Sequence, residues 1–243
     1  MIKNILITGS PRSGKSTLVR QLLGGIPHKV GFLTDEILVE DKRVGFAVET
    51  SKGDKAVLAH IDAISSHHVG RYAVNPERLD FLLSQLPQPN PDDLVYIDEI
   101  GPMELLSESF KAFVTKSLNA PNTCLATIVA ASDDAFVQQI KDRTNVIIIE
   151  ITPDNRDTQA VFVQQLINKI AKARQYLAEP ARFTQRGSTV ELQSNHGLRT
   201  LSPVGDTWRC DCDFYAEYKI CSHVIAAQEL LTSKTAINKQ KNS

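Results

Sequence analysis

Short apolar runs and amphipathic segments alternate along the first 178 residues of the chain. Runs rich in branched residues are typical of strands buried on both faces, and leucines at helical spacing are typical of helices that cover a sheet. The strand-like runs occupy residues 5–7, 29–34, 57–61, 94–97, 124–130 and 146–151. The helical patterns occupy residues 16–23, 76–86, 109–118, 134–141 and 155–177. This alternation predicts an α/β fold with a mostly parallel sheet covered on both faces.

Residues 36–50 depart from the alternation. Two strand-like arms flank Asp41-Lys42 there, which predicts a β-hairpin. Because the two arms of a hairpin are antiparallel, we expect it to be an insertion at one edge of the parallel sheet.

The pattern changes again near Glu179-Pro180. Short strands are predicted at 189–192, 198–201 and 208–212, and a helix at 221–231. A segment of roughly fifty residues with such short elements buries little apolar surface, so we expect a stabilising cross-link such as a bound metal ion. The predicted organisation is a domain at 1–178, a linker at 179–187, a small ββα-like module at 188–233 and a polar tail at 234–243.

Composition narrows the class of protein. The chain has 243 residues, 42% of them hydrophobic, and a formal net charge of −1, so we expect a folded protein whose surface as a whole does not attract nucleic acid. The sequence shows neither a secretory signal nor an apolar run near the roughly 20 residues that span a bilayer. We therefore expect a cytoplasmic protein without a membrane partner. Three of its four cysteines lie within twelve positions, which in a reducing compartment favours metal binding over disulfides.

A phosphate-binding motif lies between the first predicted strand and the first predicted helix. The sequence GSPRSGKS matches GxxxxGK[ST], and a fortuitous turn rich in glycine and serine is the alternative. Backbone N–H groups of such a loop bind phosphate oxygens, Lys15 reaches the β- and γ-phosphates and acts in catalysis, and the Ser16 hydroxyl coordinates Mg²⁺. The predicted nucleotide-binding residues are Gly9, Ser10, Pro11, Arg12, Ser13, Gly14, Lys15, Ser16, Thr17 and Asp98.

The run LVYIDEI supplies the acidic half of the expected site. Its carboxylates follow a buried strand, at the sheet edge where ligands bind in open α/β folds. Asp98 is expected to hold Mg²⁺ together with Ser16, and Glu99 to orient or deprotonate the attacking water. Two solvated acids at the end of a strand are the alternative interpretation.

Further candidates are less specific. Arg12, Arg143 and Arg156 are each possible sources of transition-state charge, although scattered arginines are usually solvated. Thr127 is either a sensor of the γ-phosphate or an ordinary strand residue. The segment Met103-Glu104-Leu105 either shapes the nucleotide pocket or serves packing.

Six segments within residues 1–178 extend beyond a generic phosphate-binding motif: GSPRSGKST (9–17), GFLTDEI (31–37), VGFAVET (44–50), YAVNPERLD (72–80), VYIDEIGPMEL (95–105) and IKDRTNVIIIEITPDNRD (140–157). Together they resemble the THEP1 family of nucleoside-triphosphatases. The resemblance implies a RecA-like P-loop fold of the ASCE class and slow hydrolysis of several nucleotides, among them ATP and GTP. Lys15, Ser16, Asp98 and Glu99 stand at positions that match the family's site residues, and Asn155-Arg156 matches a late pair of the family.

A second chemical motif, CxC-x₈-CxH, lies near the C-terminus. Its members Cys210, Cys212, Cys221 and His223 are natural tetrahedral Zn²⁺ ligands, and four of them would close the coordination shell of a structural ion. Unligated thiols and a disulfide are the alternatives. Residues 187–231 resemble the SWIM zinc finger, which implies contact with protein or DNA; a purely intramolecular role is the other possibility.

The sequence thus favours a Mg²⁺-dependent enzyme that hydrolyses NTP and carries a zinc module. Two alternatives stay open. A P-loop kinase would transfer phosphate to a small molecule or a nucleic-acid end, and an adaptor would use nucleotide to switch the binding of DNA or protein without significant turnover.

Overall fold

The computed structural model describes residues 1–205 and 207–241, and it describes side chains as far as residue 231 apart from residue 206. The chain divides into two compact units. One comprises Lys3–Val161, and the other comprises Met1–Ile2 together with the chain from Phe162 onward. The division falls inside helix α5 (Arg156–Ala178), upstream of the expected boundary after residue 178.

The larger unit contains a nine-stranded sheet in the order β5-β6-β4-β3-β2-β7-β8-β1-β9. The strands are β1 Asn4–Thr8, β2 Lys29–Val39, β3 Lys42–Thr50, β4 Lys55–His60, β5 His67–Val69, β6 Tyr72–Val74, β7 Leu94–Ile100, β8 Cys124–Ile128 and β9 Val146–Glu150. In the half of the sheet with the order β2-β7-β8-β1-β9, neighbouring strands are parallel. In the other half, with the order β5-β6-β4-β3-β2, neighbouring strands are antiparallel. The sheet is therefore mixed, and the expectation of a mostly parallel sheet has to be corrected.

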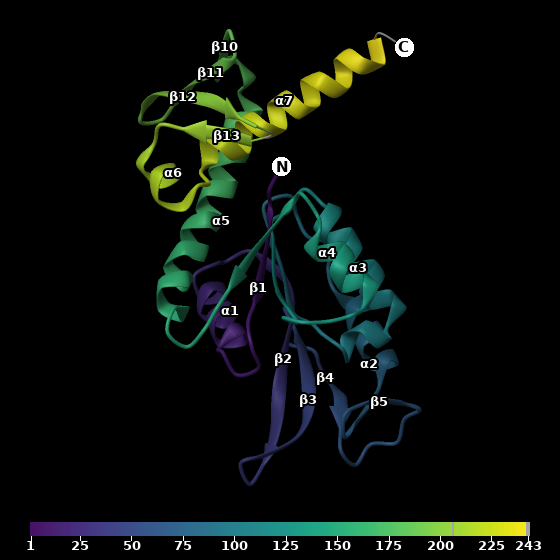
Figure 1. Ribbon diagram of the computed structural model, residues 1–243. Helices are drawn as coiled ribbons and strands as arrows, with labels where there is room; N and C mark the ends of the chain where they lie inside the picture. The colour runs from purple at the N-terminus through teal and green to yellow at the C-terminus, as the bar shows by residue number, and fades with distance from the viewer. Residues whose placement is uncertain (206, 242–243) are drawn as a thin grey trace. The chain divides into compact units, whose positions relative to one another are not determined.

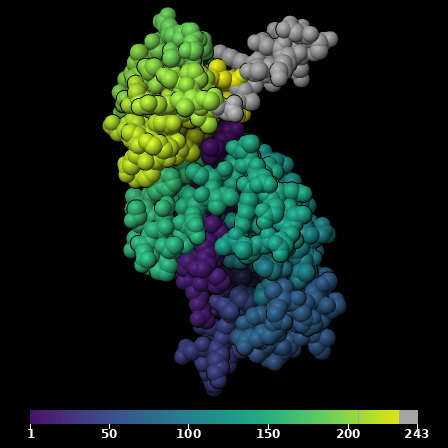
Figure 2. All heavy atoms as spheres, viewed as in Figure 1, coloured from purple at the N-terminus to yellow at the C-terminus, as the bar shows by residue number. Residues whose placement is uncertain are grey.

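The antiparallel half grows from the predicted hairpin. β2 pairs with β3 from Phe32↔Thr50 to Val39↔Lys42, which is the expected pairing around Asp41. In Figure 2 the tip of this hairpin projects from the surface of the larger unit. The sequence did not predict β5 and β6, because strands of three residues are too short to show a period of two.

The helices of the larger unit cover both faces of the sheet, as predicted (Figure 1). They are α1 Lys15–Gly24, α2 Pro76–Gln85, α3 Glu108–Asn119 and α4 Ala135–Lys141, with a short 3₁₀ turn, η1, at Glu104–Leu106. Side chains of Asn75, Ser107 and Asp134 cap the starts of α2, α3 and α4, which explains why these helices begin there. Apolar residues of α2, α3 and α4 share one core with the sheet, including the fully buried Phe110 and Val114.

The C-terminal unit contains a four-stranded antiparallel sheet in the order β10-β11-β12-β13. Its elements are η2 Pro180–Arg182, β10 Phe183–Arg186, β11 Thr189–Ser194, β12 Gly197–Val204, β13 Thr207–Cys210, α6 Asp213–Tyr218 and α7 Ser222–Lys241. Residues 179–187 are thus largely structured, because β10 pairs with β11 where a linker was expected. The unit is also larger than the expected ββα-like module. Helix α7 continues to Lys241, so most of the expected polar tail is helical, and residues 242–243 lie outside the described residues.

Helix α5 is buried along one face. Buried residues recur at helical spacing along it, and they end at Tyr176, which is 1% exposed. The aromatic rings of Phe162 and Phe214 both lie against Tyr218, with centroid distances of 4.6 and 4.7 Å. These contacts explain why residues after Val161 group with the C-terminal unit. Within the described residues, the helices are all too short or too polar to cross a membrane.

Candidate functional site

The phosphate-binding motif forms the turn between β1 and α1. Gly9 and Gly14 have φ angles of 149° and 95°, which L-residues with a side chain rarely adopt. A Cβ atom on Gly9 would lie 2.4 Å from the carbonyl oxygen of Ile151, and one on Gly14 would lie 2.7 Å from Cδ of Arg156. Both glycines are therefore required by the local structure. Lys15 Nζ donates hydrogen bonds to the Gly9 and Ser10 carbonyl oxygens at 3.0 and 3.3 Å, so its ammonium group lies within the loop.

The structure brings together the two residues expected to hold Mg²⁺. Ser16 Oγ donates a hydrogen bond to Asp98 Oδ1 at 3.1 Å, although the two residues are 82 positions apart. Thr127 Oγ1, on the adjacent strand β8, donates to the same oxygen at 2.5 Å. Asp98 is 1% exposed, and its second oxygen, Oδ2, has no hydrogen-bond partner among the described residues. Burial raises the pKa of the Asp98 carboxyl, and the bonds from Thr127 and Ser16 partly oppose this rise.

Two glutamates follow Asp98 at the end of β7. Burial raises the pKa of Glu99, while the positive charge of Lys15 lowers it and the charge of Asp98 raises it. Glu104, on η1, is 4% exposed, and burial together with the charge of Glu99 raises its pKa to about 8. The two side chains meet at Gly101, where a Cβ atom would lie 2.7 Å from Glu99 Oε1 and 3.2 Å from Glu104 Oε2. From the sequence, the segment that contains Glu104 could either shape the nucleotide pocket or serve packing. The signal that placed it near the site was its position five residues after Glu99.

The three arginine candidates lie in different surroundings. Arg156 lies against Gly14 of the phosphate-binding loop, as the short Cβ distance indicates. Asn155 accepts a hydrogen bond from the Thr152 backbone N–H at 2.8 Å, which fixes the start of the helix that carries Arg156. Arg12 is exposed in the loop and has a φ angle of 66°.

Arg143 is not part of this site. Its guanidinium donates hydrogen bonds to Asn119 and Asn145. The carbonyl oxygen of Asn145 accepts bonds from the backbone N–H groups of Lys3 and Asn4, where β1 begins. Arg143 therefore lies at the amino ends of the parallel strands, whereas the phosphate-binding loop lies at their carboxyl ends.

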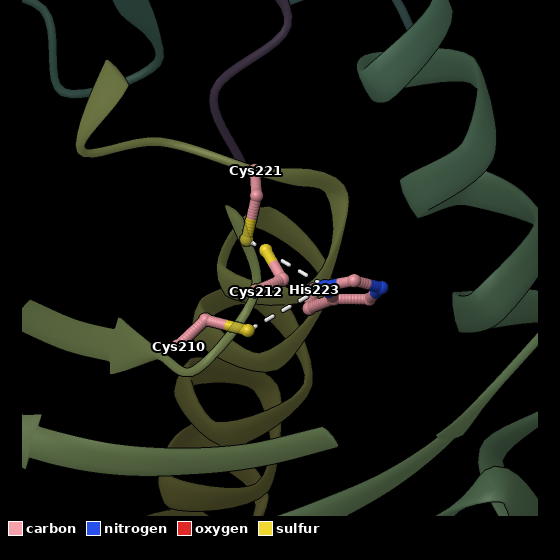
Figure 3. A group of neighbouring side chains, drawn as sticks. All are labelled: Cys210, Cys212, Cys221 and His223. Atoms are coloured by element: carbon pink, nitrogen blue, oxygen red, sulfur yellow. Dashed lines mark hydrogen bonds between the residues drawn. The ribbon is translucent and has the colours of Figure 1, made fainter. Parts of the chain in front are cut away.

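The second candidate site lies within the C-terminal unit. The three cysteine sulfurs and the His223 imidazole point toward one another (Figure 3). Their potential ligand atoms all lie within 4.8 Å of one another, and His223 Nδ1 lies 3.5 Å from Cys210 Sγ and 3.7 Å from Cys221 Sγ. Cys210 ends β13, Cys212 caps α6, Cys221 directly precedes α7, and His223 lies in the first turn of α7. All four residues are buried.

The chemistry of this cluster suits a soft metal ion. Zn–S bonds of about 2.3 Å in tetrahedral geometry separate ligand atoms by roughly 3.8 Å, close to the distances observed here. The pKa of the Cys212 thiol is lowered, because the Cys210 and Cys221 thiols and His223 form hydrogen bonds with its sulfur. All four cysteines of the chain are described and none forms a disulfide. His196 lies in the turn before β12 and is not a member of the cluster.

The fold and the first site together define the class of protein. A phosphate-binding loop between the strand β1 and the helix α1 is bonded through its serine to a buried aspartate of β7, and β8 separates β7 from β1 in the sheet. This is the arrangement of P-loop NTPases. The sequence model of the family described as NTPase matches residues 4–167.

Relatives of known name agree with this class. The nucleoside-triphosphatase THEP1 of Thermotoga sp. (strain RQ2) is 40% identical over 158 residues, which cover 63% of this chain and 89% of the relative. The crystal structure of THEP1 from Aquifex aeolicus superposes with a TM-score of 0.60 and 30% identity, covering 68% of this chain and 98% of that one. The solution structure of a human cancer-related nucleoside triphosphatase gives a TM-score of 0.57 and 27% identity, covering 68% and 97%. The chain belongs to the THEP1 family of nucleoside-triphosphatases.

Proposed function

We propose that this protein hydrolyses nucleoside triphosphates, ATP and GTP among them, to the diphosphate and phosphate in a Mg²⁺-dependent reaction. The observation that carries the proposal is the hydrogen bonding of the buried Asp98. The hydroxyl groups of the half-buried Ser16 and the buried Thr127 hold one of its carboxylate oxygens, and the other oxygen has no partner among the described residues. A buried carboxylate oxygen of this kind is costly unless a cation or a water molecule satisfies it.

The proposed roles of the residues follow from their positions. The backbone N–H groups of residues 9–17 and the Lys15 ammonium bind the phosphates, and the buried Ser13 hydroxyl, which has no partner among the described residues, offers a further donor. Ser16 and Asp98 hold Mg²⁺, which supplies charge neutralisation at the phosphates. Glu99 orients the attacking water and accepts its proton. Arg156, beside Gly14, is the arginine best placed to contact the transferring phosphate.

The hydrolysis assay tests this proposal directly. We expect phosphate release from ATP and GTP with Mg²⁺ and none after chelation with EDTA. Lys15→Ala should abolish turnover, and Glu99→Gln should bind nucleotide but hydrolyse it at least about a hundredfold more slowly. A fully active Glu99→Gln variant would refute the role of Glu99. Phosphate that appears on an acceptor would indicate a kinase, and a lack of turnover even with partners present would indicate a nucleotide-switched adaptor.

We also propose that Cys210, Cys212, Cys221 and His223 bind a structural zinc ion in a SWIM-type module that contacts protein or DNA. Support comes from the spacing of the ligands and from their convergence within 4.8 Å. Metal analysis should find one zinc per chain, and thiol alkylation should begin after chelation. Cys124 is an internal control, because burial raises its pKa to about 12 and should keep it unreactive throughout.

If the three clustered thiols react at once in the purified protein, they are unligated cysteines and the zinc proposal fails. The partner class is tested in the hydrolysis assay by adding single-stranded or duplex DNA. Strong stimulation by DNA would assign the module to nucleic acid, and unchanged turnover would favour a protein partner.

A further inference from the structure

The larger unit contains a cavity of about 540 Å³ that the proposed reaction does not use, here called the distal cavity. Its base is formed by Val30 and Val95, which pair with each other near the amino ends of β2 and β7 and are 7% and 2% exposed. Because the phosphate-binding loop lies at the carboxyl ends of the parallel strands, the distal cavity is separate from the nucleotide site. Its volume falls within the roughly 300–1,000 Å³ that is typical of sites for small molecules.

The walls of the distal cavity are apolar and stiff. Leu83 of α2 and Phe113 of α3 line it, and these two helices pack against each other. The chain that leaves α2 adds Pro87, Pro89 and Pro91. Because the ring of a proline fixes its φ angle, this wall has little freedom to collapse into the cavity. An apolar molecule would therefore meet a surface of fixed shape.

Hydrogen bonds within the chain hold the proline-containing wall in place. Asn122 Nδ2 donates to the carbonyl oxygens of Asn90 and Asp93 at 2.7 and 2.9 Å. Asp93 Oδ2 accepts a bond from the backbone N–H of Asn90 at 2.7 Å. The side chains of Asn122 and Asp93 belong to residues that are 3% and 7% exposed, so these bonds are shielded from water. A wall that is already ordered lowers the entropic cost of binding.

The charged groups of the distal cavity are divided between its two ends. Lys116 is the only cationic side chain among the described residues that line it. Its ammonium group donates to Gln88 Oε1 at 2.9 Å and makes no ion pair with a described residue, so its charge is not neutralised. Asp80, the acidic residue of the lining, accepts a hydrogen bond from Ser107, which caps the start of α3. Lys116 lies in the last turn of the same helix, about 14 Å further along its axis.

We propose that the distal cavity binds a small amphipathic anion: an aromatic or branched aliphatic body packs against Leu83 and Phe113, and one carboxylate or sulfonate group pairs with Lys116. The apolar body removes the lining from water, and the anionic group supplies the charge that Lys116 lacks. A nucleotide does not suit this cavity, because its several charges would lose their water against apolar walls that offer one cation. The proposal does not depend on the hydrolytic reaction.

The test uses two fluorescent dyes that share an aromatic body. Anilinonaphthalene sulfonate carries one negative charge, and phenylnaphthylamine is its uncharged analogue. Titration of the full chain should show one site for each dye, with tighter binding of the sulfonate. Lys116→Met should weaken the sulfonate by about three- to tenfold and leave the uncharged dye within about twofold. Lys111→Met, which removes a cation of the same helix outside the lining, is the matched control and should change neither affinity.

A filled cavity gives the second arm of the test. Ala112→Trp places a ring in the cavity and should weaken both dyes by at least about tenfold. Thr115→Trp adds the same ring to α3 outside the lining and should bind both dyes like the wild type. Should Ala112→Trp fail to fold, Ser109→Trp takes its place, because Ser109 also lines the cavity.

Four results would overturn the proposal. If neither dye binds, or if binding survives the tryptophan substitution in the lining, the cavity is not the site. If Lys116→Met affects the two dyes equally, Lys116 does not recognise the anionic group. If a saturating ATP analogue displaces the sulfonate, the dye occupies the nucleotide site instead.

Discussion

The bond between Thr127 and Asp98 gives a sharp prediction about the proposed Mg²⁺ site. Both side chains are buried, at 0% and 1% exposure, and Thr127 Oγ1 lies 2.5 Å from Asp98 Oδ1. Thr127→Val replaces the hydroxyl by a methyl group of similar size, so packing changes little. The carboxylate then keeps one protein donor, Ser16 at 3.1 Å.

The expected loss follows from the strength of such a bond. A hydrogen bond to a charged group contributes about 1.5–3 kcal/mol. If the reaction requires the Asp98 carboxylate in its present position, kcat/KM should fall roughly ten- to hundredfold. The Thr127 bond also opposes the rise in pKa that burial causes at Asp98. Without it that pKa rises further, so protons compete better with Mg²⁺, and the loss should be larger at low pH than at high pH.

The assay is phosphate release measured across a range of Mg²⁺ concentrations and pH values. Thr127→Ser keeps the hydroxyl and should retain most of the activity, while Thr115→Val, on the surface of α3, controls for the substitution itself. If Thr127→Val needs no more Mg²⁺ than the wild type and its kcat/KM stays within about twofold, the bond does not position Asp98 and the argument is wrong.

Two further predictions concern single side chains. Gly14→Ala combines a positive φ angle of 95° with a Cβ atom 2.7 Å from Arg156, so this variant should lose affinity for a fluorescent ATP analogue. Gly53→Ala is the control, because Gly53 has a φ angle of 85° but open space around it, and this variant should keep that affinity. Equal affinities of the two variants would contradict the steric argument. Tyr176→Phe removes a buried hydroxyl that has no partner among the described residues, so urea unfolding should show a stability unchanged or raised by up to about 1 kcal/mol. Tyr176→Ala should instead cost about 3–5 kcal/mol, because its ring stacks on His223 at 5.6 Å. A loss above about 1 kcal/mol in the Phe variant would show that the hydroxyl is satisfied after all.

The sequence could predict the parts of the site that are local in the chain. The phosphate-binding loop and its flanking strand and helix occupy one continuous segment, and the motif itself indicates phosphate binding. The acidic end of β7 was predictable only together with this loop, because a phosphate-binding loop requires a carboxylate for its Mg²⁺ at the end of a nearby strand. Two acids at the end of a strand are otherwise more often solvated. The four members of the Cys/His cluster were predictable from their spacing and side-chain chemistry.

The partners of these residues depend on strand register, which the sequence does not contain. Ile97 of β7 pairs with Ala126 of β8, and this pairing brings the next residues, Asp98 and Thr127, together. A shift of the register by one residue would turn Thr127 to the other face of the sheet. The same limit applies to Arg143, whose position at the opposite end of the strands follows from β1 and β9 pairing in parallel. It also explains β10, whose four residues form a strand because β11 lies beside them.

The nucleotide site collects groups that oppose folding. Asp98, Glu99 and Glu104 all have raised pKa values because they are buried. A carboxyl group whose pKa is higher in the folded than in the unfolded protein binds more protons when folded, so its contribution to stability falls as pH rises. For Glu104 this window runs from the ordinary value of 4.5 to about 8. Sequence selection for stability alone would replace these residues by amides or apolar side chains. A triphosphate with its cation, bound between Lys15, Ser16 and Asp98, would offset the repulsion among the carboxylates, which is a physical reason for the site to keep them.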